Sequence, residues 1–274
     1  MLKTRLLTAL FLIPLVFLAL FKASPYAWQG IMAGVVLLAA WEWSRLAKFS
    51  PLIKVLFIGL TAVAGVGVYI GWHMAAFRAI WIVFTLGFWF VLVPLWLWKK
   101  AKIDQPVVMW LAGWLVLLPF WLGMEIWRNH APSIPSGARL LLAIMMLVWV
   151  ADTAAYFAGK AFGKHKLAPA ISPGKTWEGA VGAAVGVLIY AYAMSFTHWL
   201  LPLGLSLPAL LLLGVVMTPL SIIGDLYESW LKRCAGVKDS SQLLPGHGGI
   251  LDRIDALMAV VSVSLVLFEL SRSI

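Results

Sequence analysis

Long apolar runs are the feature of this sequence that most restricts its fold. A helix needs roughly 20 apolar residues to cross the hydrocarbon core of a bilayer, and the chain contains about nine such runs. They lie near residues 6–21, 27–44, 52–72, 79–98, 106–124, 138–158, 179–200, 208–227 and 254–270. Because the runs are continuous rather than alternating, they favour helices over barrel strands. The sequence therefore predicts an all-α fold, a polytopic transmembrane helical bundle with about nine spans.

Composition supports a lipid environment. The chain is 63% hydrophobic and only 12% charged, whereas a soluble domain is roughly a quarter charged. The single cysteine, Cys234, excludes an intramolecular disulfide framework and a multi-cysteine metal site. Lys3 and Arg5 before the first run resemble the start of a signal peptide, but no A-x-A-like cleavage site follows closely at 21–25. We therefore expect a retained first span.

Basic residues indicate the orientation of the chain. If the N-terminus and the loops after the second, fourth, sixth and eighth runs are cytoplasmic, they hold 16 of the 21 Lys and Arg residues. This asymmetry follows the positive-inside rule. It places the N-terminus and the loops at 159–178 and 229–253 in the cytoplasm. The net charge of +10 needs no nucleic acid as partner, since anionic membrane lipid and anionic substrates account for it.

Acidic residues divide the chain into two regions. Only Glu42, Asp104 and Glu125 precede residue 150, and eight acidic residues follow it. We interpret 1–137 as an N-terminal transmembrane scaffold and 138–274 as a C-terminal transmembrane catalytic region. A carboxylate within a span is costly and marks a candidate functional site; Asp152, within the sixth run, is one such residue.

The segment from Ser172 to Gly179 predicts an anion site. Pro173 and Gly174 end regular structure, and Thr176 is placed to cap the helix that follows. Backbone N–H groups at a helix start, with Lys175 beside them, bind anions. The P-loop spacing is absent. An alternative is a basic loop that contacts lipid phosphates and has no catalytic role.

Two carboxylate pairs flank the last polar loop. Asp225 and Glu228 lie three apart at the end of the eighth run, and Asp252 and Asp255 lie three apart at the start of the ninth. Each pair occupies one helix face, so the two pairs can converge on a hard cation. The basic residues interleaved with them are Lys232, Arg233, Lys238 and Arg253. Carboxylates with several cations suggest a metal-bound polyphosphate, and simple pairing of these acids and bases is the alternative.

The same block resembles the phosphatidate cytidylyltransferases, also called CDP-diglyceride synthases. The family pattern is matched without departure by Ser229, Lys232, Arg233, Lys238, Asp239, Leu244, Pro245, Gly246, His247, Gly248, Gly249, Asp252, Arg253 and Asp255. The segments at 151–156 and 172–176 are also similar to the family's, and Trp41-Glu42-Trp43 resembles a weaker N-terminal feature. The resemblance spans the chain and is specific after about residue 148.

The resemblance implies that CTP and phosphatidic acid are joined to give CDP-diacylglycerol and pyrophosphate, with Mg²⁺, in phospholipid biosynthesis. It further implies a homodimer in a bacterial-type inner (plasma) membrane. We assign metal binding to Asp225 and Asp252, with Asp152, Glu228 and Asp255 as further ligands or neighbours of ligands. The residues assigned to substrate binding are Ser172, Lys175, Lys232, Arg233, Lys238, His247 and Arg253. The residues assigned to catalysis are Asp225, Asp252, Lys175 and His247.

Two other functions fit parts of the pattern. A CTP-using lipid or polyprenol kinase would also need cations and carboxylates, but the block from Ser229 to Asp255 counts against it. A transporter of an anionic solute would also contain intramembrane carboxylates. In this chain, however, the acidic residues gather at one membrane face rather than at the midplane.

Overall fold

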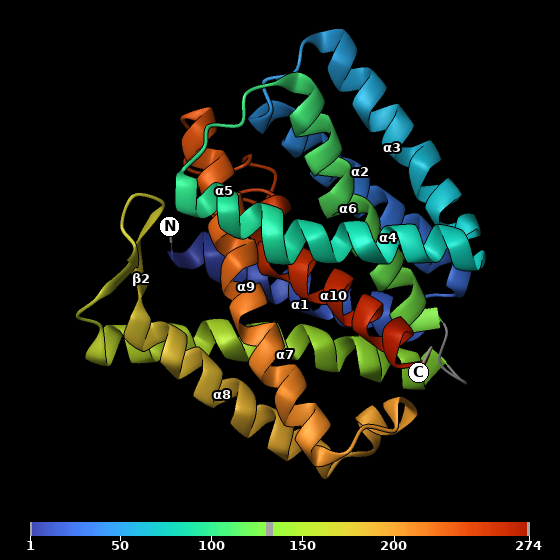
Figure 1. The fold of residues 1–274 in the computed structure, drawn as a ribbon, viewed down its shortest axis with the longest axis vertical. Helices are drawn as coiled ribbons and strands as arrows, with labels where there is room; N and C mark the ends of the chain where they lie inside the picture. The colour runs from blue at the N-terminus through green and yellow to red at the C-terminus, as the bar shows by residue number, and fades with distance from the viewer. Residues whose placement is uncertain (1, 130–133, 273–274) are drawn as a thin grey trace.

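The computed structural model describes residues 2–129 and 134–272 as a bundle of helices that cross one another at varied angles (Figure 1). The helices of the first half are α1 (Leu2–Lys22), α2 (Pro25–Leu46), α3 (Pro51–Gly71), α4 (Ala75–Gly87), a π-helix (Phe88–Leu92), α5 (Val93–Lys99) and α6 (Pro106–Asn129). The elements of the second half are α7 (Ile134–Phe162), strands β1 (Lys166–Ala168) and β2 (Ser172–Thr176), α8 (Trp177–Ser195), a 3-10 helix (His198–Leu203), α9 (Leu207–Ala235) and α10 (Leu251–Ser271).

Among the described residues, seven helical segments are long and apolar enough to cross a membrane. They are Pro51–Gly71, Ala75–Lys99, Pro106–Asn129, Ser136–Phe162, Trp177–Ser195, Leu207–Ala235 and Leu251–Ser271, which correspond to the last seven predicted runs. The first predicted run falls in α1, of which the part searched for a span, within the described residues, is the shorter apolar helix Leu10–Lys22. The second forms α2, which carries the polar residues Gln29, Glu42 and Arg45. The predicted fold class, a polytopic helical membrane bundle, is confirmed.

The centre of the bundle is formed by α6 and α10 (Figure 1). Every residue of α10 from Ala256 to Val266 is buried. A helix that is apolar on all sides is expected in such a position, enclosed by other helices. At its N-terminal end, α10 packs against α9 so closely that a Cβ at Gly224 would lie 2.8 Å from the carbonyl oxygen of Asp255. The C-terminal half of α9, which carries Asp225 and Glu228, and the start of α10 are therefore side by side.

An aromatic cluster holds the same end of α9. Tyr227 is 1% exposed, and four rings surround it at centroid distances of 5.7 to 6.3 Å. These rings belong to Trp43, Phe88, Trp89 and Trp96, all from the first half of the chain. Because Tyr227 lies between Asp225 and Glu228 in sequence, this packing fixes the helix segment that carries both carboxylates.

Small residues allow α7 and α8 to pack closely. Both helices contribute residues to the candidate site. A Cβ at Gly182 would lie 2.2 Å from the Cβ of Ala158, and one at Gly186 would lie 2.6 Å from the Cβ of Ala154. Glycine at positions four apart lets two membrane helices approach backbone to backbone. Packing between α7 and α8 therefore depends on the absence of side chains at these positions.

We expect Gly182→Leu to lower the stability of the bundle by about 1–3 kcal/mol, because the added side chain overlaps Ala158. Gly67→Leu is the matched control, since Gly67 lies in the membrane helix α3 with no atom within 4 Å of an added Cβ. The measurement is thermal unfolding of both variants in detergent. Equal melting temperatures for the two variants would contradict the packing role of Gly182.

Candidate active site

A short hairpin and a capped helix start position Lys175. Strands β1 and β2 pair antiparallel, with Lys166 opposite Thr176 and Ala168 opposite Ser172. Thr176 is the N-cap of α8, and its Oγ1 accepts a hydrogen bond from the backbone N–H of Gly179 at 3.1 Å. The predicted helix cap at Thr176 is confirmed. The hairpin itself was not predicted, because two strands of three and five residues give little periodic signal.

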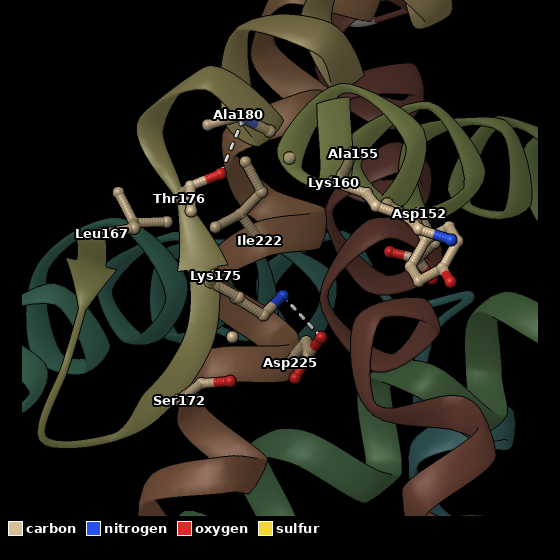
Figure 2. Close-up of a pocket in the computed structure, with 14 residues that line it drawn as sticks. Asp152, Ala155, Lys160, Leu167, Ser172, Lys175, Thr176, Ala180, Ile222 and Asp225 are labelled. Atoms are coloured by element: carbon tan, nitrogen blue, oxygen red, sulfur yellow. Dashed lines mark hydrogen bonds and ion pairs between the residues drawn. The ribbon is translucent and has the colours of Figure 1, made fainter. Parts of the chain in front are cut away.

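The Lys175 side chain extends from β2 toward α9, and Figure 2 shows its amine facing the Asp225 carboxylate. The distance from Nζ to Oδ2 is 2.5 Å. Both groups line a cavity of about 470 Å³, which we call the hairpin cavity. Its lining residues are Asp152, Ala155, Tyr156, Gly159, Lys160, Leu167, Ser172, Gly174, Lys175, Thr176, Gly179, Ala180, Ile222 and Asp225. A lysine of the hairpin and a carboxylate of α9 thus meet in a cavity lined by the C-terminal halves of α7 and α9.

Three aspartates from three helices gather at this point. Asp152 interacts electrostatically with Asp225 and Lys175, and Asp255 interacts with all three of these residues. The three carboxylates outnumber the two lysines that line the cavity, Lys160 and Lys175, so the group attracts a further cation. As the side chains stand, no group of three or more His, Cys, Asp or Glu able to hold a metal is found within the described part of the chain.

A second ionic group links α9 to α10. The Lys232 amine lies 2.5 Å from Glu228 Oε2 and 2.6 Å from Asp252 Oδ1. The other oxygen of Asp252 accepts hydrogen bonds from the backbone N–H and hydroxyl of Ser240 and from the N–H of Gly249, at 2.7 to 2.9 Å. Glu228 also interacts electrostatically with Asp252 and Asp255. The structure therefore brings the two predicted carboxylate pairs together.

The polar loop between α9 and α10 folds into a tight turn. The N–H of Leu244 donates to the carbonyl of Gly248, and the N–H of His247 donates to the carbonyl of Leu244, at 2.9 and 2.8 Å. Gly246 and Gly248 have φ values of 77° and 81°, a region that favours glycine. The turn lines a second cavity of about 720 Å³, which we call the loop cavity. Its lining residues are Lys238, Asp239, Ser241, Gln242, Leu244, Pro245, Gly246, His247, Gly248 and Arg253.

The predicted site residues therefore fall into three sets. Those at the hairpin cavity and its aspartate group are Asp152, Ser172, Lys175, Asp225 and Asp255. Those in the ionic link between helices are Glu228, Lys232 and Asp252. Those at the loop cavity are Lys238, His247 and Arg253. Arg233 belongs to none of them, since its Nε donates to the carbonyl of Ile171, 3.3 Å away, at the hairpin turn.

The sequence predicts a scaffold role for Glu42, whereas the structure places its carboxylate against the polar loop. It accepts hydrogen bonds from Ser240, Ser241, Ile250 and Leu251. The signal that could have found it is a carboxylate within an apolar run, the criterion that identified Asp152.

Fold and site together define a multi-pass membrane protein with facing carboxylates and lysines at one end of its helices. The chain belongs to the cytidylyltransferase family, whose model matches residues 3–271. It is 38% identical to a phosphatidate cytidylyltransferase of Haemophilus influenzae, over 95% of this chain and 96% of the relative. It is 40% identical to a protein of that name from Pseudomonas aeruginosa, over 96% and 95% of the two chains. A third, from Staphylococcus haemolyticus, is 45% identical over 46% of this chain and 47% of its own length.

We expect Lys175→Ala to lower cytidylyltransferase turnover by at least about tenfold, or roughly 1.4 kcal/mol in the barrier. Lys175→Arg should restore only part of the rate, because a planar guanidinium does not replace a compact ammonium facing Asp225. Lys166→Ala is the control, since Lys166 is exposed in the same hairpin. A near-normal rate for folded Lys175→Ala protein would contradict a catalytic role for Lys175. The segment from Ser172 to Gly179 would then be a basic loop that contacts lipid phosphates.

Proposed function

We propose that this protein transfers the cytidylyl group of CTP to phosphatidic acid, giving CDP-diacylglycerol and pyrophosphate. The observation that carries the proposal is the set of carboxylates from α7, α9 and α10 with Lys175 and Lys232 placed on them. Family membership and the names of the two full-length relatives add support. A site built from carboxylates and cations suits the handling of phosphates.

The reaction requires two anions to meet. A phosphate oxygen of phosphatidic acid attacks the α-phosphorus of CTP, and the bond from that phosphorus to the bridging oxygen breaks as pyrophosphate leaves. A phosphate monoester is already largely ionised near pH 7, because its second pKa is about 6. A strong general base is therefore not required. The protein must instead hold both substrates in line and disperse their charge.

We assign the phosphate of the lipid to the hairpin cavity. Lys175 and Lys160 supply positive charge there, and Ser172 supplies a hydroxyl. The neighbouring surface of α7 and α8 is apolar, since Phe157 and Trp177 are 63% and 58% exposed. A lipid can leave its chains in the bilayer along such a surface while its phosphate reaches the lysines.

We assign the nucleotide to the loop cavity. Lys238 and Arg253 are exposed there, and His247 is placed to donate a hydrogen bond to a phosphate oxygen. Asp225 of α9 lines the hairpin cavity, and Arg253 of α10, next to Asp252 in sequence, lines the loop cavity. Transfer would take place where α9 and α10 meet.

The donor set also fits Mg²⁺. Oxygen ligands favour this ion over softer metals, and the Lys232 amine between Glu228 and Asp252 shows that a cation is held where α9 meets α10. We propose that Asp225 and Asp252 hold the metal, with Asp152, Glu228 and Asp255 beside them. When bound, Mg²⁺ would neutralise phosphate charge and polarise the phosphorus–oxygen bonds.

We further propose that the N-terminus and the site face the cytoplasm from a bacterial inner membrane, and that the protein is a homodimer. The orientation is supported by the 16 basic residues in the segments assigned to the cytoplasm. The membrane is suggested by the bacterial relatives, and the dimer by family resemblance. We also propose that residues 138–274 carry the chemistry while 1–137 supports it.

The proposal is tested by incubating purified protein with phosphatidic acid, Mg²⁺ and CTP labelled at the α- or the γ-phosphate. We expect the α-label in the lipid and the γ-label in pyrophosphate. A lipid kinase would instead transfer the γ-label to the lipid and release CDP. A transporter would move solute into vesicles without forming a covalent product, so either result would contradict the proposal.

A further inference from the structure

Glu42 is a fully buried carboxylate in the half of the chain that we assigned to the scaffold. Its side chain has 0% exposure, and both oxygens are occupied. Oε1 accepts from the Ser241 hydroxyl at 2.5 Å and from the N–H of Ile250 at 2.9 Å. Oε2 accepts from the N–H of Leu251 at 2.7 Å and lies 3.0 Å from the Ser240 hydroxyl, whose single proton it shares with Asp252. All four donors lie in the polar loop or at the start of α10.

Through these contacts Glu42, a residue of α2, caps the N-terminus of α10. The N-cap residue of α10 is Ile250, which provides no side-chain capping hydrogen bond. The first N–H groups of a helix need acceptors and carry partial positive charge. Glu42 provides both an acceptor and a negative charge, although it precedes Leu251 by 209 positions. The start of α10 therefore depends on a residue of α2.

The same contacts lead directly to Asp252. The Ser240 hydroxyl lies between two carboxylates, 3.0 Å from Glu42 Oε2 and 2.8 Å from Asp252 Oδ2. Gly249, whose N–H donates to Asp252, is the neighbour that permits this arrangement. A Cβ at Gly249 would lie 2.1 Å from Ser240 Oγ and 2.4 Å from Glu42 Oε1. Glycine is thus required for the loop to close around the Glu42 carboxylate.

We propose that Glu42 is a positioning residue for the reaction. It holds the loop from Ser240 to Ile250 and the first turn of α10, and through them it orients the Asp252 carboxylate. Asp252 in turn holds the Lys232 amine through an ion pair. The proposal rests on the proposed function, because Asp252 is the group through which Glu42 would affect binding of Mg²⁺ and CTP.

The test compares Glu42→Gln with Glu125→Gln. Glu125 is the matched control, since it is a buried glutamate in α6 at 3% exposure that contacts Asn129 and not the loop. A glutamine at 42 keeps the shape but turns an amino group toward two of the four donors. We expect Glu42→Gln to lower kcat at least about tenfold and to raise the Mg²⁺ concentration needed for half-maximal rate. Glu125→Gln should leave both within about twofold of the wild type.

A second readout does not depend on activity. Amide hydrogen exchange should quicken in the segment 238–251 of Glu42→Gln and stay unchanged in the hairpin at 166–176. Failure of the wild type to make CDP-diacylglycerol would overturn the proposed function, while the exchange measurement would still test the loop contact. If Glu42→Gln does not fold, Ser241→Ala decides instead, since it removes one of the four bonds and should give smaller shifts in the same direction.

Two results would overturn the positioning role. One is a folded Glu42→Gln protein with wild-type exchange in 238–251. The other is a lower melting temperature with kcat and Mg²⁺ dependence unchanged, which would show that Glu42 stabilises the fold alone.

Discussion

The bridge that Lys232 makes between Glu228 and Asp252 is the interaction on which the rest of the site depends. Buried charges are costly unless they are paired, and here Lys232 pairs with Glu228 one turn away on α9 and with Asp252 on α10. The bridge fixes how α9 lies against α10, so Asp225 and Asp255 are brought together one turn away. It also leaves an excess of carboxylates over lysines, which suits the recruitment of a metal-bound phosphate.

Much of this arrangement could be predicted from the sequence, because it is local. The apolar runs, the cap at Thr176 and the pairs at Asp225/Glu228 and Asp252/Asp255 each follow from spacing within one element. The remainder depends on contacts between spans far apart in the chain. No spacing rule indicates that Glu42 reaches Leu251 or that Lys175 meets Asp225. The hairpin at 166–176 is local, but its two strands are too short to give a periodic signal.

The first half of the chain contributes more to the site than a scaffold of apolar helices would suggest. Trp43, next to Glu42, donates from Nε1 to the carbonyl of Met109 at 2.9 Å and packs near Tyr227. Adjacent residues of α2 thus contact both α9 and the loop that precedes α10. Rigid packing around a polar site reduces the reorganisation needed when charge develops in the transition state. The fold therefore holds the carboxylates in position before the substrates bind.

The central claim is that carboxylates of α9 and α10 act as one unit that holds metal and phosphate. It is tested by measuring the Mg²⁺-dependent rate and the melting temperature of Asp225→Asn, Asp252→Asn and the double variant on the same samples. We predict that each single change lowers turnover at least about 100-fold, and that the double change costs little more. Stable single variants that keep their Mg²⁺ dependence and most of their turnover would contradict the account.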